Sequence, residues 1–169
     1  MKDQTPVAVV GCGPAGLMAA TVLSEAGLPV EMFDAKGSAG SKFLVAGRGG
    51  LNLTHAEPAE PFAARYGTNA EIFKKFLAGF SPNDLRAWLR GLGVETFVGT
   101  SGRVFPKDAT AHDILKTWIE ALSRRGVVFH YRHRWQGFAP TGAPLFLTDT
   151  GELLAFPAQG LLLALGGAS

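Results

Sequence analysis

A glycine-rich turn near the amino terminus combines residue types and spacing that could bind phosphate groups. It reads Gly-Cys-Gly-Pro-Ala-Gly and fits the pattern G-x-G-x-x-G. In such a turn Gly11 allows the tight bend, Gly13 lets the backbone approach a pyrophosphate, and Gly16 allows a helix to pack closely on a strand. Pro14 suits the first helical turn, where its missing N–H is harmless, and Ala15 completes the phosphate-facing set. The helix that follows would direct its N–H groups and its positive dipole end at the phosphates.

The elements around this turn are those that a dinucleotide-binding fold requires. Residues 7–10 are a short run typical of a buried strand, residues 17–26 are compatible with a helix, and residues 28–33 predict a second strand. Asp34 closes the second strand, 18 residues after Gly16, near the spacing of an acid that bonds a ribose hydroxyl. An ordinary glycine turn in an α/β protein is the alternative, but strand, turn, helix and acid together favour a dinucleotide site.

The same stretch lies inside an uncharged run, residues 4–24, which could instead be a membrane span or a secretory signal. Pro6, Pro14 and three glycines interrupt the run, and both residue types weaken a helix interior. The first three residues are nearly neutral, whereas a signal peptide begins with a basic region and ends in a small-residue cleavage site. We therefore expect no membrane segment.

A second glycine-rich stretch covers residues 35–55. It has little helical periodicity, and such a loop can bring backbone N–H groups close to an anionic or planar ligand. Lys42 and Arg48 add positive charge. A flexible surface loop is the alternative, but the apolar residues 43–45 favour a structured loop that faces a ligand.

The rest of the chain alternates helical and extended patterns. Residues 56–69 are interpreted as a connector, and the apolar residues of 70–80 as the core face of a helix. Ser81 predicts the N-cap of the next helix, and Thr110 and Gly126 bracket a third. Strands are expected at 94–98, 103–105, 127–130, 136–139, 144–149, 152–156 and 160–165. The three strands within 136–156 predict an antiparallel meander, and the last strand has the apolar composition of a buried one.

Composition limits the remaining functions. The chain has 169 residues, enough for one domain with a substantial core, and a net charge of +2. Its single cysteine excludes an internal disulfide, which is consistent with a reducing compartment and predicts a cytoplasmic protein. Cys12 could be a redox thiol, but the favoured interpretation is a small residue that fills the turn. The four histidines have no metal-ligand spacing, so we expect no metal site.

Basic and aromatic residues gather at 130–135. Such a mixture can bind nucleic acid, but this cluster is short and the chain is only mildly basic. An exposed strand end is the favoured interpretation, and no nucleic-acid partner is expected.

Four motifs resemble those of the BaiN/YhiN-like family of NAD(P)/FAD-dependent flavoproteins. They are VAVVGCGPAG, SKFLVAGRGGLNLTH, GRVFPKDATAHDILKTW and LLLALGGAS. The resemblance spans most of the chain and implies an α/β fold: a Rossmann-like FAD-binding domain of glutathione-reductase type. Its expected parts are a central parallel sheet, an antiparallel β-meander and flanking helices. In that family the acid in the place of Asp34 binds the adenosine ribose.

The resemblance also implies further cofactor-binding residues. The family shows a stretch like G-R-K-L-L-I-S-G-G-G-R-C-N-x-T-N near the flavin, and five residues match it: Lys42, Gly47, Gly49, Asn52 and Thr54. Other positions of that stretch depart from the family: Ser41, Arg48, Gly50, Leu51 and His55. Trp135 matches a position whose backbone meets the adenine, and Gly166 with Gly167 resembles a turn beside the cofactor.

The resulting hypothesis is a FAD-binding domain, residues 1–169, of a flavin-dependent oxidoreductase with a small-molecule substrate. NAD(P)H is implied as reductant by the resemblance only, and no spacing identifies a catalytic residue. Family members are longer, so we expect the domain to be incomplete at its carboxyl end and to bind FAD more weakly than a longer relative. A non-catalytic nucleotide-binding module and an NAD-binding Rossmann protein are the alternatives.

Overall fold

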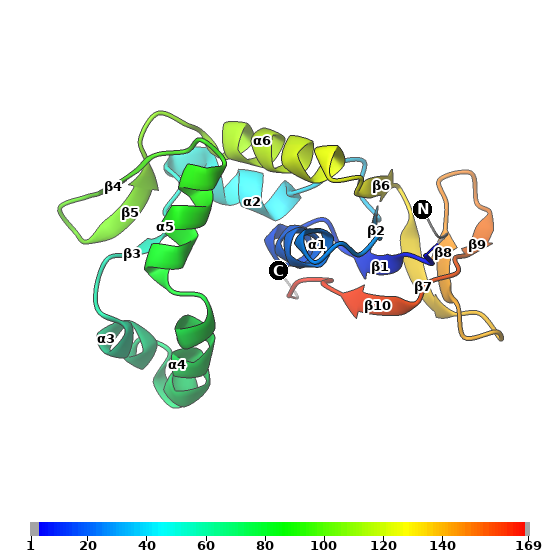
Figure 1. The fold of residues 1–169 in the computed structure, drawn as a ribbon, viewed down its shortest axis with the longest axis horizontal. Coiled ribbons are helices and arrows are strands. Elements are labelled where there is room, and N and C mark those ends of the chain that lie inside the picture. Colours follow the sequence, from blue (N-terminus) through cyan, green and yellow to red (C-terminus); the bar gives the residue numbers. More distant parts are fainter. Residues whose placement is uncertain (1–3, 168–169) are drawn as a thin grey trace. The chain divides into compact units, whose positions relative to one another are not determined.

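The structure, a computed structural model, describes residues 4–167 of the chain. These residues form two compact units (Figure 1). The first unit contains the described residues up to Val45 and those from Lys116 onward, and the second contains Ala46–Leu115. The described helices include none that is long and apolar enough to cross a membrane.

A parallel sheet forms the centre of the first unit. Its strand order is β10-β1-β2-β6, with β1 (Val7–Val10), β2 (Val30–Asp34), β6 (Val128–Tyr131) and β10 (Gly160–Leu163). All three pairings are parallel, and Val10 is in register with Phe33 on one side and with Leu163 on the other. The carboxyl ends of all four strands therefore meet at one edge, where open α/β sheets bind their ligands.

Helix α1 (Pro14–Glu25) connects β1 to β2 and packs close to the sheet. It begins at the proline, three residues earlier than the apolar pattern alone predicts, because Gly13 serves as its N-cap. A Cβ built on Gly16 would lie 1.8 Å from the carbonyl oxygen of Gly11. Only a glycine fits there, as the sequence predicts. Gly27, with φ of +78°, follows the helix end.

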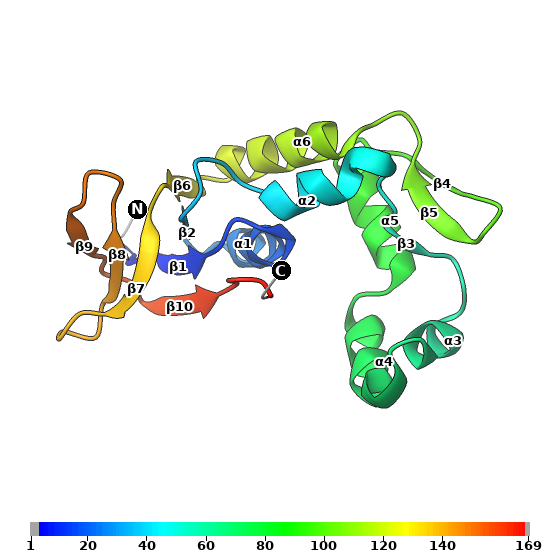
Figure 2. The ribbon, with the colours of Figure 1, turned by 180° about the vertical axis from the view of Figure 1, so that it is seen from behind.

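The antiparallel meander follows β6 and consists of β7 (Arg134–Phe138), β8 (Pro144–Leu147) and β9 (Leu153–Ala155) (Figure 2). A bulge lies between Trp135 and Gly137. Phe146 of β8 stacks on Phe33 of β2 with ring centroids 4.0 Å apart, and both rings are fully buried. This contact joins the meander to the sheet. The predicted fold class, with its parallel sheet, flanking helices and meander, is thus confirmed.

Strand β10 is only half-buried, and Leu163 is 45% exposed, whereas its apolar sequence predicts a fully buried strand. The difference arises because β10 lies at the end of the strand order among the described residues and pairs with β1 alone. An edge strand has a neighbour on one side only, so its side chains are covered less completely.

The second unit contains short helices and a small antiparallel sheet, β3-β5-β4. Its elements are η1 (Gly47–Gly49), β3 (Thr54–His55), α3 (Ala59–Ala64), η2 (Gly67–Asn69), α4 (Ala70–Gly79), α5 (Pro82–Gly91), β4 (Thr96–Val98) and β5 (Arg103–Pro106). Two further helices cross the division between the units, α2 (Ser41–Ala46) and α6 (Ala111–Arg124). Ser81 is the N-cap of α5 as predicted, and a capping box forms there, since Ser81 accepts from the Asp84 N–H and Asp84 accepts from the Ser81 N–H.

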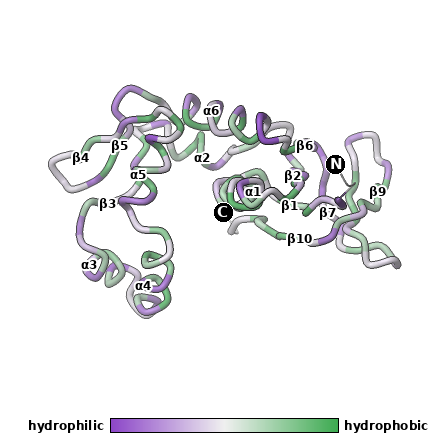
Figure 3. Tube along the Cα trace, viewed as in Figure 1, coloured by the Kyte–Doolittle hydropathy of each residue, from purple (hydrophilic) through white to green (hydrophobic). Residues whose placement is uncertain are grey.

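Three expectations for this region are corrected. The stretch 35–55 contains helix α2 and turn η1 in addition to loop, and the expected connector 56–69 contains helix α3. Helix α4 forms where predicted, and Figure 3 shows hydrophobic and hydrophilic residues mixed around it. Its apolar side chains are not core, however, because Ile72 is 49% and Phe76 is 59% exposed. Periodicity identified the helix but not what its apolar side chains pack against.

Candidate functional site

A cavity of about 400 Å³ lies at the carboxyl ends of β1 and β2, within the first unit. Eight of the predicted cofactor-binding residues line it: Gly11, Gly13, Pro14, Ala15, Asp34, Lys42, Trp135 and Gly166. The cavity is in the size range of small-molecule sites and occupies the crevice where Rossmann folds bind nucleotides. The tertiary structure thus collects residues from five separate stretches of the chain.

The glycine turn forms one wall of this cavity. Gly11 has φ of +105°, and a Cβ there would lie 2.3 Å from the carbonyl oxygen of Ala164. A Cβ on Gly13 would meet nothing within 4 Å, so the backbone at Gly13 is open to an approaching group. The first N–H groups of α1 have no partner within the helix, and its dipole adds positive potential. These features fit a pyrophosphate.

Gly16 is the one predicted cofactor-binding residue of the turn that does not line the cavity. Its place is beneath the turn, against the Gly11 carbonyl, where it lets α1 approach β1. Its role is therefore packing, as the pattern G-x-G-x-x-G predicts for its last glycine.

Asp34 connects the end of β2 to the glycine turn. Its Oδ2 accepts a hydrogen bond of 2.7 Å from the Cys12 N–H, and its Oδ1 accepts one of 2.8 Å from the Lys36 N–H. Its backbone carbonyl accepts from the His133 N–H at 2.8 Å. An ionised carboxylate has about four lone-pair sites, so two remain for a ligand. Asp34 thus supports the turn through these backbone contacts and lines the cavity with acceptor capacity to spare.

Cys12 is fully buried inside the turn. Burial, with a smaller contribution from the charge of Asp34, raises the pKa of its thiol to about 12. Because the thiolate is the reactive form, Cys12 is neither a nucleophile nor a redox thiol at neutral pH. This supports its interpretation as a small residue that fills the turn.

Positive charge dominates the cavity wall. Lys36, Lys42 and Arg134 line it together with a single carboxylate, Asp34. Lys42 Nζ donates a hydrogen bond of 2.9 Å to the carbonyl of Gly167, which connects the start of α2 to the segment after β10. The balance of charge favours an anionic ligand.

Sequence reasoning missed Lys36 and Arg134. Each stands beside a residue that it did identify, Lys36 two positions after Asp34 and Arg134 directly before Trp135. Position next to a strand end was therefore the available signal. The indole N–H of Trp135 is buried and has no hydrogen-bond partner among the described residues.

The remaining predicted residues, Gly47, Gly49, Asn52 and Thr54, belong to the second unit. A Cβ on Gly47 would lie 2.4 Å from the Cβ of Ala111, so close packing explains this glycine. Thr54 pairs with Val104 in the small sheet, and Asn52 is exposed.

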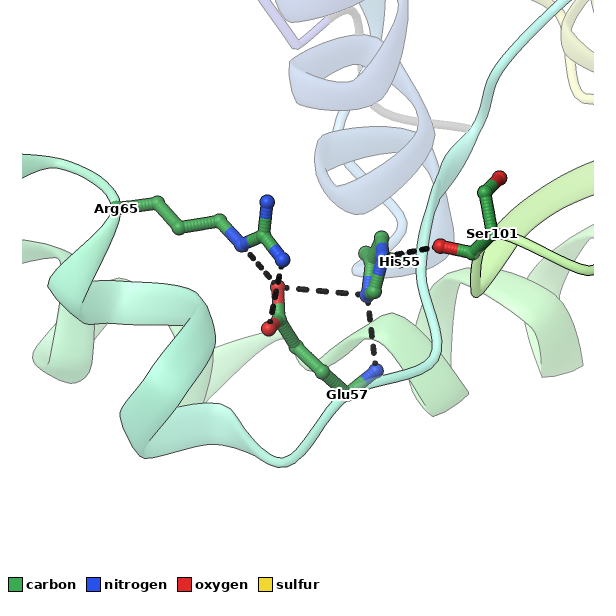
Figure 4. Close-up of polar contacts among 4 residues, drawn as sticks. All are labelled: His55, Glu57, Arg65 and Ser101. Atoms are coloured by element: carbon green, nitrogen blue, oxygen red, sulfur yellow. Dashed lines mark hydrogen bonds and ion pairs between the residues drawn. The ribbon is translucent and has the colours of Figure 1, made fainter.

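A polar cluster in the second unit joins His55, Glu57, Arg65 and Ser101 (Figure 4). His55 Nε2 lies 3.0 Å from the Ser101 carbonyl, and the Glu57 N–H lies 3.2 Å from His55 Nδ1. His55 Nδ1 also lies 3.3 Å from Glu57 Oε1. Arg65 Nη2 donates to Glu57 Oε2 at 3.0 Å. With both ring nitrogens engaged, the cluster supports the turn before β5 and lacks a free base.

Potential metal ligands do not cluster in the part of the chain that the structure describes. Among those residues no group of three histidine, cysteine, aspartate or glutamate side chains could hold a metal ion.

Comparison with solved structures shows the same fold in larger proteins. A 3-ketosteroid-Δ4-(5α)-dehydrogenase from Rhodococcus jostii RHA1 superposes with a TM-score of 0.71 and 19% identity, over 96% of this chain and 46% of that one. The open conformation of a flavocytochrome c3 fumarate reductase superposes with a TM-score of 0.76 and 19% identity, over 98% of this chain and 34% of that one. At such identities the likeness shows the fold, a Rossmann type of the FAD-binding kind.

Sequence similarity identifies a curated relative and the family of the chain. The ribosomal RNA dihydrouridine synthase of Escherichia coli (strain K12) is 26% identical over 163 residues, which are 95% of this chain. This chain spans only 39% of that relative. The family model for the HI0933-like protein Rossmann domain matches residues 5–169. With almost its whole length matched, the chain belongs to the HI0933-like Rossmann family.

Proposed function

We propose that this chain is the FAD-binding part of a flavin-dependent oxidoreductase of the BaiN/YhiN-like branch. The observation that carries the proposal is the positively lined cavity in which the glycine turn, Asp34 and Lys42 come together. An adenosine diphosphate group needs N–H donors and positive charge for its phosphates and an acceptor for its ribose, and this wall offers all three.

Each part of the cavity has a role in this proposal. The turn from Gly11 to Ala15 holds the pyrophosphate, the free lone pairs of Asp34 accept from the ribose hydroxyls, and Trp135 lies beside the adenine. Gly166 lies next to the cofactor, near the ammonium group of Lys42. The resemblance assigns Gly47, Gly49, Asn52 and Thr54 to a flavin-binding stretch. Bound flavin supplies hydride and electron transfer, while the protein binds and orients it.

The activity of a longer protein is a further proposal, since the chain spans 39% of its curated relative. We propose NAD(P)H as the reductant and a small molecule as the acceptor. The relative's name supports a second candidate, reduction of uridine in ribosomal RNA, and this candidate rests on 26% identity across 95% of the chain. In that reaction the uracil C5–C6 double bond would receive a hydride and a proton, with NAD(P)H as the source of the electrons.

Binding of FAD is tested first, by titrating the purified chain with FAD and following flavin fluorescence and absorbance. We expect saturable binding that excess NAD does not displace. Displacement by NAD would instead indicate an NAD-binding Rossmann protein, and absence of binding would overturn the proposal. The exposed carboxylate of Asp149 forms an ion pair with Arg132 and does not line the cavity. The variant D149N is therefore a control and should bind FAD as the parent chain does.

Electron transfer is tested next, by adding NADH or NADPH to the FAD-loaded chain without oxygen. Loss of the oxidised-flavin absorbance supports an oxidoreductase, whereas an unchanged spectrum supports the non-catalytic nucleotide-binding module. For the second candidate, ribosomal RNA is included and its nucleosides are analysed by mass spectrometry. Formation of dihydrouridine that depends on both FAD and NAD(P)H would favour RNA over a small-molecule acceptor.

A further inference from the structure

The carboxylate of Asp34 makes two hydrogen bonds to backbone N–H groups, and one of them belongs to the glycine turn itself. Oδ2 accepts from Cys12 at 2.7 Å and Oδ1 accepts from Lys36 at 2.8 Å. Cys12 lies between the two glycines that shape the turn, and its side chain is fully buried. The charge of Asp34 thus acts on the middle of the turn through a short, charge-assisted bond.

Further backbone contacts surround this bond. The Gly11 N–H donates to the Phe33 carbonyl at 2.7 Å, and the Cys12 carbonyl accepts from Gly40 at 2.9 Å. Cys12 is therefore bonded through both its N–H and its carbonyl, so the orientation of its peptide groups is determined on both sides. All these residues belong to the first unit.

We infer that Asp34 is a positioning residue that holds the glycine turn in its ligand-binding shape before any nucleotide arrives. The inference deepens the proposed function and rests on it for the identity of the ligand. It differs from a ribose contact, because the carboxylate acts here on the protein backbone. A turn that is already ordered loses less conformational freedom on binding, so the ligand binds more tightly.

The isosteric variant D34N separates this role from simple loss of charge. A carboxamide has one acceptor oxygen and one NH₂ group, so it cannot accept from both the Cys12 and the Lys36 N–H. One backbone donor would face another donor, and the turn would lose its support. D149N is the matched control, since Asp149 is 53% exposed and pairs with Arg132.

Affinity is measured by calorimetry with two probes, ADP and 2′,3′-dideoxy-ADP, on the parent chain, D34N and D149N. Loss of one charge-assisted hydrogen bond predicts that D34N weakens ADP binding about tenfold to a hundredfold. If Asp34 positions the turn, most of this loss persists with the dideoxy probe, which has no ribose hydroxyls for Asp34 to bind. A loss seen with ADP and absent with dideoxy-ADP would show a ribose contact only and would overturn the inference.

A second readout needs no ligand. In the ligand-free chain the NMR resonance of the Cys12 amide proton should shift as acid protonates Asp34, since that proton is donated to its carboxylate. The shift should be absent in D34N. A shift of the Cys12 amide resonance caused by protonation of the His133 ring would instead persist in that variant. A Cys12 amide that ignores acid titration in the parent chain would contradict the inference, even if D34N failed to fold. Parent chain that binds ADP but not FAD would instead contradict the proposed function alone.

Discussion

The indole N–H of Trp118 donates a hydrogen bond of 2.9 Å to the hydroxyl oxygen of Thr21, inside the core of the first unit. The two residues are 97 positions apart, and the same hydroxyl donates to the Leu17 carbonyl at 2.9 Å. Thr21 is the buried polar residue among the otherwise apolar buried side chains of the described chain. It joins α6 to α1, the helix that presents its amino terminus to the cavity.

Replacement of Thr21 by valine should therefore destabilise the first unit. Valine has the same shape but accepts no hydrogen bond, so the Trp118 N–H loses this acceptor inside the core. We expect the free energy of unfolding to fall by about 1–3 kcal/mol, measured by urea denaturation. The double variant T21V/W118F should lose less than the two single variants together, because the donor and the acceptor are then both removed. Strict additivity would contradict the coupling.

Replacement of Gly16 by alanine should disrupt the fold at the turn. The new Cβ would stand 1.8 Å from the Gly11 carbonyl oxygen, which is backbone and cannot turn away. We expect a loss of about 3 kcal/mol or more in the free energy of unfolding, together with loss of FAD binding. Gly79, at the end of α4, has open space at its Cβ position, so G79A is the control and should be neutral or slightly stabilising. Equal stability of G16A and G79A would refute the packing role.

Replacement of Gly13 by alanine should separate binding from stability. Its Cβ would meet no protein atom within 4 Å, so the free energy of unfolding should change by less than about 1 kcal/mol. The methyl group would occupy space through which the proposed pyrophosphate approaches the backbone, and FAD affinity should fall roughly tenfold or more. Thermal unfolding and FAD titration of the same preparation check both parts. Unchanged affinity would mean that the ligand does not approach this face of the turn.

Alkaline pH should destabilise the chain partly through Cys12. Burial raises the pKa of its thiol from 9.0 to about 12, so the folded state retains a proton that the unfolded state releases. This stabilisation is complete below about pH 9 and is lost as the pH rises toward 12. One group contributes at most about 1.4 kcal/mol per pH unit. Denaturation between pH 8 and about pH 11 should show a shallower decline for C12A than for the parent chain, and identical slopes would exclude this origin.

Local sequence determined the elements that build the site. The apolar run before Gly11 specified β1, the spacing of glycines specified a turn and a helix start, and Ser81 specified the N-cap of α5. These signals are readable because they depend on backbone conformation and on hydrogen bonds between residues a few positions apart. The α/β class and the meander followed from the same short-range patterns.

Tertiary structure alone decided which of these residues meet. Lys42 reaches the carbonyl of Gly167 across 125 positions, and Lys36 and Arg134 complete the same cavity wall from two distant strand ends. It also left the apolar face of α4 exposed and placed β10 at an edge, although both patterns resemble buried segments. Periodicity reports that a segment has an apolar side, but what covers that side depends on topology, which brings together residues distant in the chain.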